Sequence, residues 1–321
     1  MALIIGVDKY AADSTGIVQN LTTCENDAKM MNDQLRRDYR GETFFSIETL
    51  LSNKAKFYIV SERVNNLFNS INGDTVLFYF AGHAMKNSDD TYLLTTDYSA
   101  TCPGISMHYL LCQAARHPNK KKIIILDCCY SGSFGTYDYL KNLSMIPENT
   151  VILASTSSKD KAYGYGDKNG VFTSLFRDAL ESDIGNIFGE ITTEDVYRFI
   201  SSALSPWQQT PIYKANITKP IVLKKTQPKI TADEIKLMTE IFTTKDSVIE
   251  LSEDYLQFSE LTTDELKKKE MFRLFEKLYI YGLLTPTVNN INIYQAALNN
   301  KLIELTNLGK FYYECYINEK I

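Results

Sequence analysis

The stretch Lys121–Gly135, KKIIILDCCYSGSFG, constrains the fold more than any other part of the sequence. Residues Ile123–Leu126 form an unbroken apolar run between a group of lysines and a Ser-Gly turn. A run this short and this apolar predicts a strand that is buried on both faces. Asp127, Cys128 and Cys129 follow at its carboxyl end, where open parallel sheets carry their reactive groups. The sequence therefore predicts a sheet with a site at the end of this strand.

A second apolar run ends in the same way and contributes a histidine. Val76–Phe80 leads into Ala-Gly and then His83. A thiol and an imidazole at neighbouring strand ends are a candidate nucleophile and base. Taken alone, a buried cysteine more often fills space, and a histidine after a strand is more often an ordinary turn residue. The two together, each flanked by glycine, favour the catalytic interpretation.

Strands and helices are expected to alternate along the first two thirds of the chain. The periodicity predicts helices over 21–35, 54–71, 105–115, 170–180 and 193–204. It predicts further strands over 2–7, 46–51, 74–80, 92–95, 151–154 and 220–223. This alternation is typical of an α/β fold with a mostly parallel central sheet flanked by helices. Thr22 or Thr23 is expected to cap the first helix.

The chain of 321 residues, 44% of them hydrophobic, is long enough for two domains. Residues 224–229 are polar, basic and contain proline, which is typical of a linker. The predicted domains are therefore 1–223, with the α/β pattern, and 230–321, a small, mainly helical domain with its longest helix over 265–281. The Leu308-Gly309 pair is expected to form a turn in the last apolar run.

Several classes of protein do not fit the composition. The six cysteines show no paired CxxC spacing, and three histidines are too few for a finger-type zinc site. The apolar stretch at the N-terminus is about five residues long, too short for a signal peptide or a membrane span. We therefore expect a cytoplasmic protein with free thiols. The net charge of −5 gives no case for nucleic-acid binding.

Several sequence blocks resemble those of the caspase-like cysteine peptidases, the clan of caspases, metacaspases, paracaspases and their bacterial relatives. The resemblance covers Ala2 to about Leu223 and is closest to metacaspases. It rests on ALIIGVDKY from Ala2, CENDA from Cys24, FYFAGH from Phe78, DCCYSG from Asp127, GVFT from Gly170 and QQTPIY from Gln208. It implies a cysteine endopeptidase on a central, mostly parallel sheet with flanking helices.

The resemblance assigns the catalytic roles within these blocks. It implies that Cys129 is the nucleophile and His83 the base, and it places Cys128 at a non-catalytic position. Strand alternation would also point Cys128 the other way. The implied oxyanion hole uses the backbone amides of Cys129 and Ala84. The family usually has glycine where this chain has Ala84, which can serve only if the backbone there needs no positive φ.

The implied substrate pocket, S1, is formed by Cys24, Asp27 and Asp127. The chain lacks the arginines with which true caspases hold an aspartate side chain, so the two carboxylates favour Arg or Lys at the cleavage position. The structural alternative is that Asp27 caps a helix and Asp127 binds turn amides.

No cofactor is certain from the sequence. The resemblance alone suggests calcium, for which Asp89, Asp90 and Asp97 are candidates at most, and the metal ligands are left open. The expected partners are a protein substrate with Arg or Lys at the cleavage site and an activating protein bound by residues 230–321. The ending of that domain resembles winged-helix domains, and bacterial relatives built this way suggest a role in stress or antiviral defence.

Two other functions remain open at this point. One is a catalytically silent scaffold that uses the same fold for binding, and the other is a separate thiol hydrolase or transferase. A peptidase that cuts after basic residues could also process itself. Exposed linkers are where such cuts concentrate, and the candidate sites are Lys141, Lys224, Lys225 and Lys229.

Overall fold

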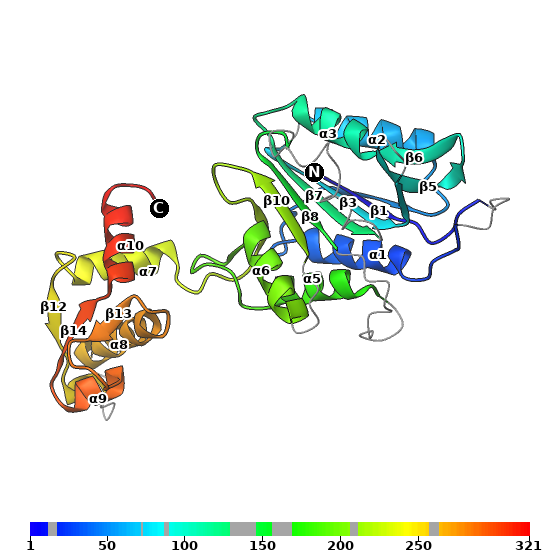
Figure 1. The fold of residues 1–321 in the computed structure, drawn as a ribbon. Helices are drawn as coiled ribbons and strands as arrows, with labels where there is room; N and C mark the ends of the chain where they lie inside the picture. Colours follow the sequence, from blue (N-terminus) through cyan, green and yellow to red (C-terminus); the bar gives the residue numbers. More distant parts are fainter. Residues whose placement is uncertain are drawn as a thin grey trace. The chain divides into compact units, whose positions relative to one another are not determined.

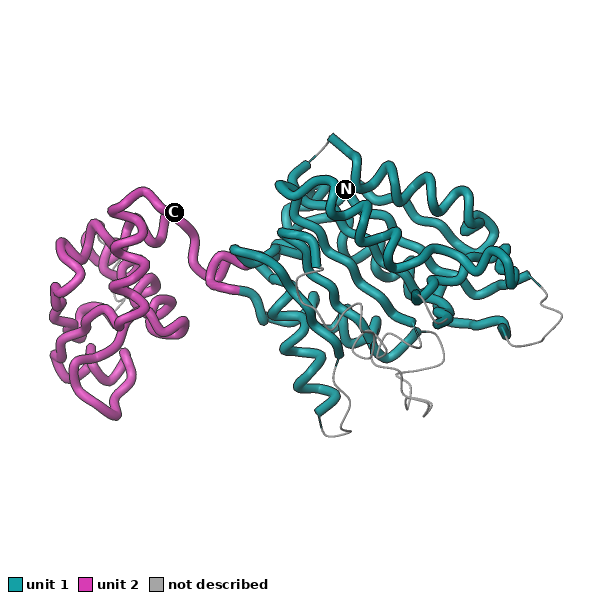
Figure 2. Tube along the Cα trace, turned by 45° about the horizontal axis from the view of Figure 1, so that its top comes forward, with its two compact units in different colours: residues 1–185, 190–226 teal, residues 186–189, 227–321 magenta. Residues whose placement is uncertain are grey.

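The computed structural model describes residues 1–11, 18–71, 73–86, 90–128, 146–155, 169–205, 211–256 and 263–321. The chain divides into two compact units, coloured separately in Figure 2. Unit 1 contains Met1–Gly185 and Glu190–Thr226, and unit 2 contains Asn186–Gly189 and Gln227–Ile321.

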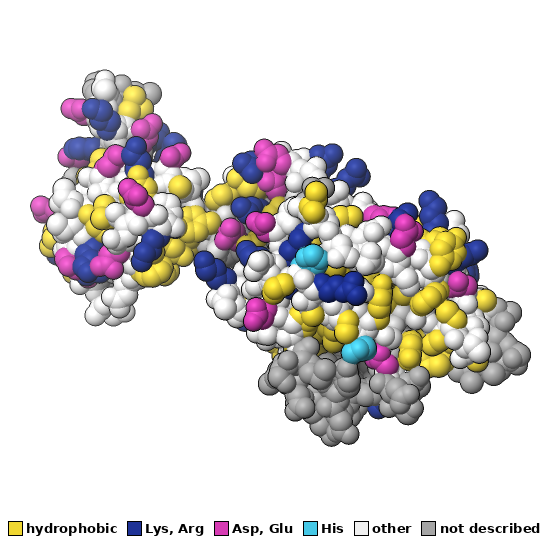
Figure 3. Space-filling model, turned by 90° about the horizontal axis from the view of Figure 1, so that it is seen from above, with side chains coloured by type: hydrophobic (Ala, Val, Ile, Leu, Met, Phe, Trp, Pro, Cys, Tyr) yellow, Lys and Arg dark blue, Asp and Glu magenta, His cyan; other side chains and the backbone are white. Residues whose placement is uncertain are grey.

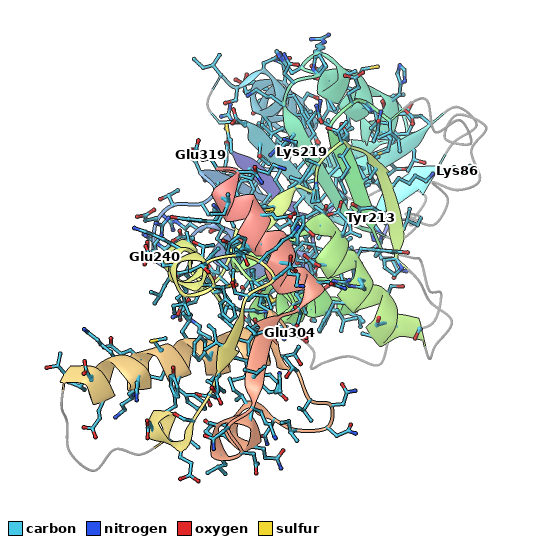
Figure 4. The ribbon with its side chains drawn as sticks, turned by 90° about the vertical axis from the view of Figure 1, so that its left-hand side faces the viewer. Lys86, Tyr213, Lys219, Glu240, Glu304 and Glu319 are labelled. Carbon is cyan, nitrogen blue, oxygen red and sulfur yellow. The ribbon has the colours of Figure 1, made fainter. Side chains whose placement is uncertain are left out.

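The central sheet of unit 1 has six strands among the described residues, in the order β10-β8-β7-β3-β1-β2. All its pairings are parallel except that of the edge strand β10 with β8. Tyr213 lies on this edge strand (Figure 4). The strands are β1 (Ala2–Gly6), β2 (Ile47–Leu51), β3 (Thr75–Gly82), β7 (Lys121–Cys128), β8 (Thr150–Ala154) and β10 (Ile212–Asn216). The predicted mostly parallel sheet is confirmed.

Helices cover both faces of this sheet (Figure 1). One face packs against α1, α5 and α6, and the other against α2 and α3. The helices are α1 (Cys24–Leu35), α2 (Phe57–Asn69), α3 (Met107–Ala115), α5 (Val171–Glu181) and α6 (Thr193–Leu204). Burial on both faces explains why the central strands read as continuous apolar runs.

Strand β7 shows how alternation divides its side chains between the two faces. Ile123 and Ile125 pack in the core with α1 and α5, whereas Ile124, Leu126 and Cys128 pack in the core with α2 and α3. Asp127 therefore projects from the α1/α5 face and Cys128 from the opposite one.

A small antiparallel sheet, order β4-β5-β6, lies beyond the end of β3. Its strands are β4 (Ala84–Lys86), β5 (Thr91–Ser99) and β6 (Cys102–Ser106). The helix predicted over 105–115 is confirmed as α3, but its predicted start was wrong, because Ile105 pairs with Leu93 and α3 begins only after its N-cap Ser106. Met85 and Lys86, at the end of β4, pair with Tyr92 and Thr91 of β5 (Figure 4).

Two further predictions at element ends need correction. The helix predicted over 54–71 ends at Asn69, and Ile71 lies outside it with 94% of its surface exposed. The strand predicted over 220–223 is β11 (Val222–Lys225), which pairs with the unpredicted β9 (Glu190–Thr192). Two of the residues predicted as linker, Lys224 and Lys225, thus lie in a paired strand.

Unit 2 combines helices with a three-stranded antiparallel sheet of order β12-β14-β13. The predicted long helix is confirmed as α8. The elements are α7 (Ala232–Ile241), β12 (Val248–Glu250), the 3₁₀ turn η4 (Glu253–Tyr255), α8 (Thr263–Ile280), β13 (Leu284–Pro286), α9 (Ile293–Leu298), β14 (Leu302–Leu305) and α10 (Asn307–Ile317).

The turn predicted at Leu308-Gly309 was wrong, because both residues lie in the first turn of α10. Thr306 caps this helix by accepting a hydrogen bond from the Gly309 amide. A Cβ at Gly309 would lie 2.0 Å from the carbonyl oxygen of Leu283, so glycine is needed for close packing rather than for a turn.

Unit 2 is completed by four residues from the segment between α5 and β9. The Ile187 carbonyl accepts the amide hydrogens of both Lys229 and Ile230. The ring of Phe188 packs edge-on against Tyr312, with 5.6 Å between centroids. Ile187 itself is part of the core that α7 and α8 form.

Candidate active site

The two predicted strand ends lie side by side at the carboxyl ends of two central strands of the sheet. Strands β3 and β7 are parallel neighbours, and their register pairs Ala81 with Asp127 and Gly82 with Cys128. His83 follows Gly82, the last residue of β3, and Cys128 is the last residue of β7. Cys129 lies outside the described residues, and its thiol is not placed.

His83 is held by groups from the segment that follows β1. Its backbone amide donates a hydrogen bond to the hydroxyl of Tyr10, at 2.7 Å. Its ring nitrogen Nε2 lies 2.8 Å from the carbonyl oxygen of Gln19, and the Tyr10 ring packs beside the imidazole with 5.1 Å between centroids. The neighbouring chain thus fixes both the backbone and the ring of this histidine.

Ala84 has a backbone conformation that suits an alanine. It is not among the described non-glycine residues with positive φ, which are Asn149, Asn290, Asn300 and Glu319. The Leu94 amide donates to the His83 carbonyl, so the Ala84–Leu93 pair is of the non-hydrogen-bonded type. The Ala84 N–H therefore points away from β5.

Asp27 and Asp127 converge on the first turn of α5. A Cβ built on Gly170 would lie 3.2 Å from Oδ2 of Asp27 and 3.1 Å from Oδ2 of Asp127. Asp27 accepts hydrogen bonds from the Asn169 side chain and the Gly170 amide, at 2.9 and 3.0 Å. Asp127 accepts one from the Thr173 hydroxyl at 2.7 Å. Each carboxylate therefore binds groups at the start of α5, and the two carboxylates lie close to each other there.

Burial and mutual repulsion disfavour the charge on this pair. Desolvation, followed by the charge of Asp127, raises the pKa of Asp27 to about 7. Desolvation also raises the pKa of Asp127, against the hydrogen bonds from Thr173 and Ser155. Among the described residues, the donors to these carboxylates are amides and hydroxyls. A cation brought between them would relieve the repulsion.

Cys24 forms part of the surroundings of the pair without adding a charge. Its thiol is free and buried, and burial, followed by the charge of Asp127, raises its pKa. The thiol therefore stays protonated near neutral pH. The same residue begins α1, where Asp8 accepts the amide hydrogens of Cys24 and Glu25 at 2.9 and 3.2 Å.

The predicted threonine cap of α1 was wrong, because Asp8 supplies the capping oxygens. Thr23 occupies the N-cap position but makes no side-chain capping bond. Asp8 comes 15 residues earlier in the sequence, just after β1. Capping rules consider only the residues directly before a helix, so they could not identify Asp8 as the cap.

The sequence of residues 1–222 matches the family described as the Caspase domain. The chain belongs to the caspase family. No curated protein gives a significant match to it. A crystallised protein from Geobacter sulfurreducens is similar, with 17% identity and a TM-score of 0.50, over 71% of this chain and 97% of that chain. The structure of pro-sf-caspase-1 is 13% identical, with a TM-score of 0.47, over 71% of this chain and 91% of that one. At these identities the likeness concerns the fold alone.

The two candidate calcium ligands that the structure describes, Asp90 and Asp97, bind different backbone amides of the caspase domain. Asp97 accepts the amide hydrogen of Phe57 at the start of α2, whereas Asp90 accepts those of Thr91 and His108. Asp89 lies outside the described residues. The part of the chain that the structure describes contains no group of three or more His, Cys, Asp or Glu that could hold a metal ion.

The surface and the helices of the protein add two observations. Lys and Arg side chains are interspersed with Asp and Glu on the face shown in Figure 3. Within the described ranges, none of the helices has the length and apolar character that a membrane crossing requires.

Proposed function

We propose that this caspase-family protein is a cysteine endopeptidase that cleaves protein substrates after Arg or Lys. The observation that carries the specificity is the pair of recessed carboxylates at the start of α5, whose hydrogen-bond donors among the described residues are neutral. An Arg side chain could pair with both, and Lys would supply a single charge. Cys24, Asp27 and Asp127 would form the S1 pocket.

The proposed chemistry uses the adjacent ends of β3 and β7. The Cys129 thiol would pass its proton to His83, and the thiolate would attack the carbonyl carbon of the scissile bond. The amide hydrogens of Ala84 and Cys129 would stabilise the oxyanion. His83 would then protonate the leaving amine, and water would hydrolyse the thioester. The parallel register of the two strands and the orientation of the Ala84 amide support these roles.

The regulatory part of the proposal concerns unit 2. Its strand order, with β14 between β12 and β13, supports a winged-helix-like module. Its net charge over residues 226–321 is −4, from 11 basic and 15 acidic residues, which favours a protein partner over DNA. We propose that residues 230–321 receive an activating protein, in a metacaspase-type enzyme of bacterial stress or antiviral defence. Cys24, Cys102, Cys112 and Cys315 are free thiols, which supports a reducing, cytoplasmic location.

A panel of fluorogenic peptides with Arg, Lys or Asp at the cleavage position tests the proposal. The panel is run on the full chain, with and without calcium, beside the Cys129→Ala variant. We expect turnover of the Arg and Lys peptides only, and none by the variant. Cleavage after Asp would contradict the proposed pocket. Turnover of no peptide under any of these conditions would favour the silent scaffold.

A further inference from the structure

The residues that follow β1 are hydrogen-bonded to the residues that precede α1. The Tyr10 amide donates to the side-chain oxygen of Asn20 at 3.0 Å, and the Leu21 amide donates to the Asp8 carbonyl at 2.8 Å. These bonds hold Tyr10 and Gln19 close together in space. Both residues contact His83, one through its hydroxyl and ring and the other through its carbonyl.

The Tyr10 hydroxyl connects the ends of β1 and β3. It donates its proton to the Val7 carbonyl at 3.0 Å, so it meets the His83 amide as an acceptor at 2.7 Å. The Val7 amide in turn donates to the carbonyl of Ala81. Burial raises the pKa of the Tyr10 phenol, so the hydroxyl remains neutral and keeps this donor and acceptor pattern.

Gly82 packs closely against the same hydroxyl. A Cβ at Gly82 would lie 2.8 Å from the Tyr10 oxygen and 2.9 Å from the ring of Phe80. Close approach therefore explains the glycine before His83. The strand end is packed around the Tyr10 hydroxyl as well as bonded to it.

We propose that Tyr10 is a positioning residue for the dyad, holding His83 and the following Ala84 amide in place through its hydroxyl. This inference rests on the proposed function. The His83 amide hydrogen is already bonded to the Tyr10 hydroxyl. The oxyanion would therefore be bound by the next amide along the chain, that of Ala84. The alternative is that Tyr10 serves only as a core side chain, since its ring also packs with the α2/α3 core.

The variant Tyr10→Phe separates the two roles, because it keeps the ring and removes only the hydroxyl. The protein has three histidines, so labelling with ¹⁵N-histidine gives three backbone amide signals, and His83→Gln assigns one of them. In Tyr10→Phe, the His83 amide should shift and exchange with solvent about tenfold faster or more. The signals of His108 and His117 should stay in place, which also reports that the fold is intact. An unchanged His83 signal would overturn the proposal.

Kinetics on the same full-length variant provide the catalytic readout. We expect kcat for an Arg peptide to fall about tenfold while KM changes less than about twofold, because a looser dyad affects the chemical step. Tyr109→Phe is the matched control, since its hydroxyl donates to the Ser61 carbonyl in the helical layer. An active wild type with equal kcat in Tyr10→Phe would refute the positioning role and leave the proposed function standing.

A second readout, the rate of thiol alkylation, tests the positioning role even if the protein cleaves none of the peptides. Iodoacetamide alkylates the Cys129 thiolate, with iodide leaving and the thiol proton passing to His83, and mass spectrometry locates the product. Slower alkylation in Tyr10→Phe than in wild type and Tyr109→Phe would support the positioning role even if the peptidase proposal failed. Equal alkylation rates in all three proteins would overturn it.

Discussion

The hydroxyl of Thr173 donates to Oδ2 of Asp127 at 2.7 Å, and the Tyr79 hydroxyl lies 2.6 Å from the same Thr173 oxygen. Thr173 has one proton, which it gives to the carboxylate, so Tyr79 must donate to Thr173. Thr173 and Tyr79 are buried. This short chain of hydrogen bonds favours the charged form of Asp127 against the desolvation that raises its pKa.

Thr173→Val should therefore weaken cleavage after Arg. A hydrogen bond to a charged group contributes about 1.5–3 kcal/mol, so kcat/KM should fall by about one to two decades. Thr173→Ser keeps the hydroxyl and is the matched control, expected to stay near wild type. Equal losses in both variants would show that packing, rather than the hydrogen bond, matters at this position.

Asp27→Asn tests the charge of the proposed pocket directly. Removing one member of a desolvated ion pair costs roughly 2–5 kcal/mol, or about one and a half to four decades in kcat/KM. We expect this loss for both the Arg and Lys peptides. Asp233→Asn, in the first turn of α7, is the control for a general change of charge. If Asp27→Asn were as active as wild type, Asp27 would have no role in binding the Arg or Lys side chain.

The same variant should be more stable than the wild type at neutral pH. The pKa of Asp27 is about 7 in the folded protein, above its ordinary value of 3.8, so the folded state binds this proton more tightly than the unfolded state. Stability from Asp27 is thus present at low pH and is lost as pH rises from about 4 to 7. Asp27→Asn avoids this loss of up to about 4 kcal/mol. Thermal unfolding at pH 5 and pH 7.5 checks it, because the variant's advantage should be clearly larger at the higher pH.

Peptide cleavage should depend on pH through the same group. Below about pH 7 Asp27 binds a proton and the pocket loses charge, so wild-type kcat/KM for Arg peptides should approach that of Asp27→Asn. The ratio of the two rates should rise with pH and level off above about pH 8. Taking the ratio removes the titration of the dyad, which both proteins share. A ratio that does not vary with pH would contradict the assignment.

The dyad is tested by three substitutions. His83→Ala and Cys129→Ala should each abolish cleavage and leave far-UV circular dichroism unchanged. Cys128→Ala should keep most activity, because Cys128 packs in the α2/α3 core rather than on the Asp127 face. An inactive Cys128→Ala beside an active Cys129→Ala would reverse the assignment of the nucleophile.

Self-processing, if it occurs, should avoid the two lysines of β11. The Lys224 side chain donates to Gln34 at 2.8 Å, and both Lys224 and Lys225 lie in the strand that pairs with β9. A protease needs an unpaired chain, so we expect any new termini to lie elsewhere than after Lys224 or Lys225. Mass spectrometry of the active protein beside Cys129→Ala would reveal them. Intact, uncut chains in both proteins would rule out self-cleavage.

The sequence predicted the parts of this fold that depend on local pattern. The apolar runs before Asp127 and His83 identified β7 and β3, and a parallel sheet then placed the two strand ends together. Short strands that pair with distant segments could not be predicted from local pattern. Ile105 looked helical from its neighbours, yet it pairs with Leu93, a contact that no local periodicity reports.

The supports of the site were harder to predict than its catalytic candidates. The bond from His83 to Tyr10 spans 73 residues, and that from Gly170 to Asp27 spans 143. Such contacts follow from the folded arrangement rather than from spacing along the chain. A signal for Tyr10 existed in ALIIGVDKY, where a lone tyrosine follows an apolar strand, but its role needed the structure.

The loop at Ile187 and Phe188 has a consequence for modularity. A fragment starting at Gln227 would lack the carbonyl that binds the amides of Lys229 and Ile230, and the ring that packs on Tyr312. The C-terminal unit is therefore not a single continuous segment that could be moved to another protein by one cut in the chain. The unit includes residues 186–189 as well as 227–321, so a fusion that uses it must also supply an acceptor for the amides of Lys229 and Ile230.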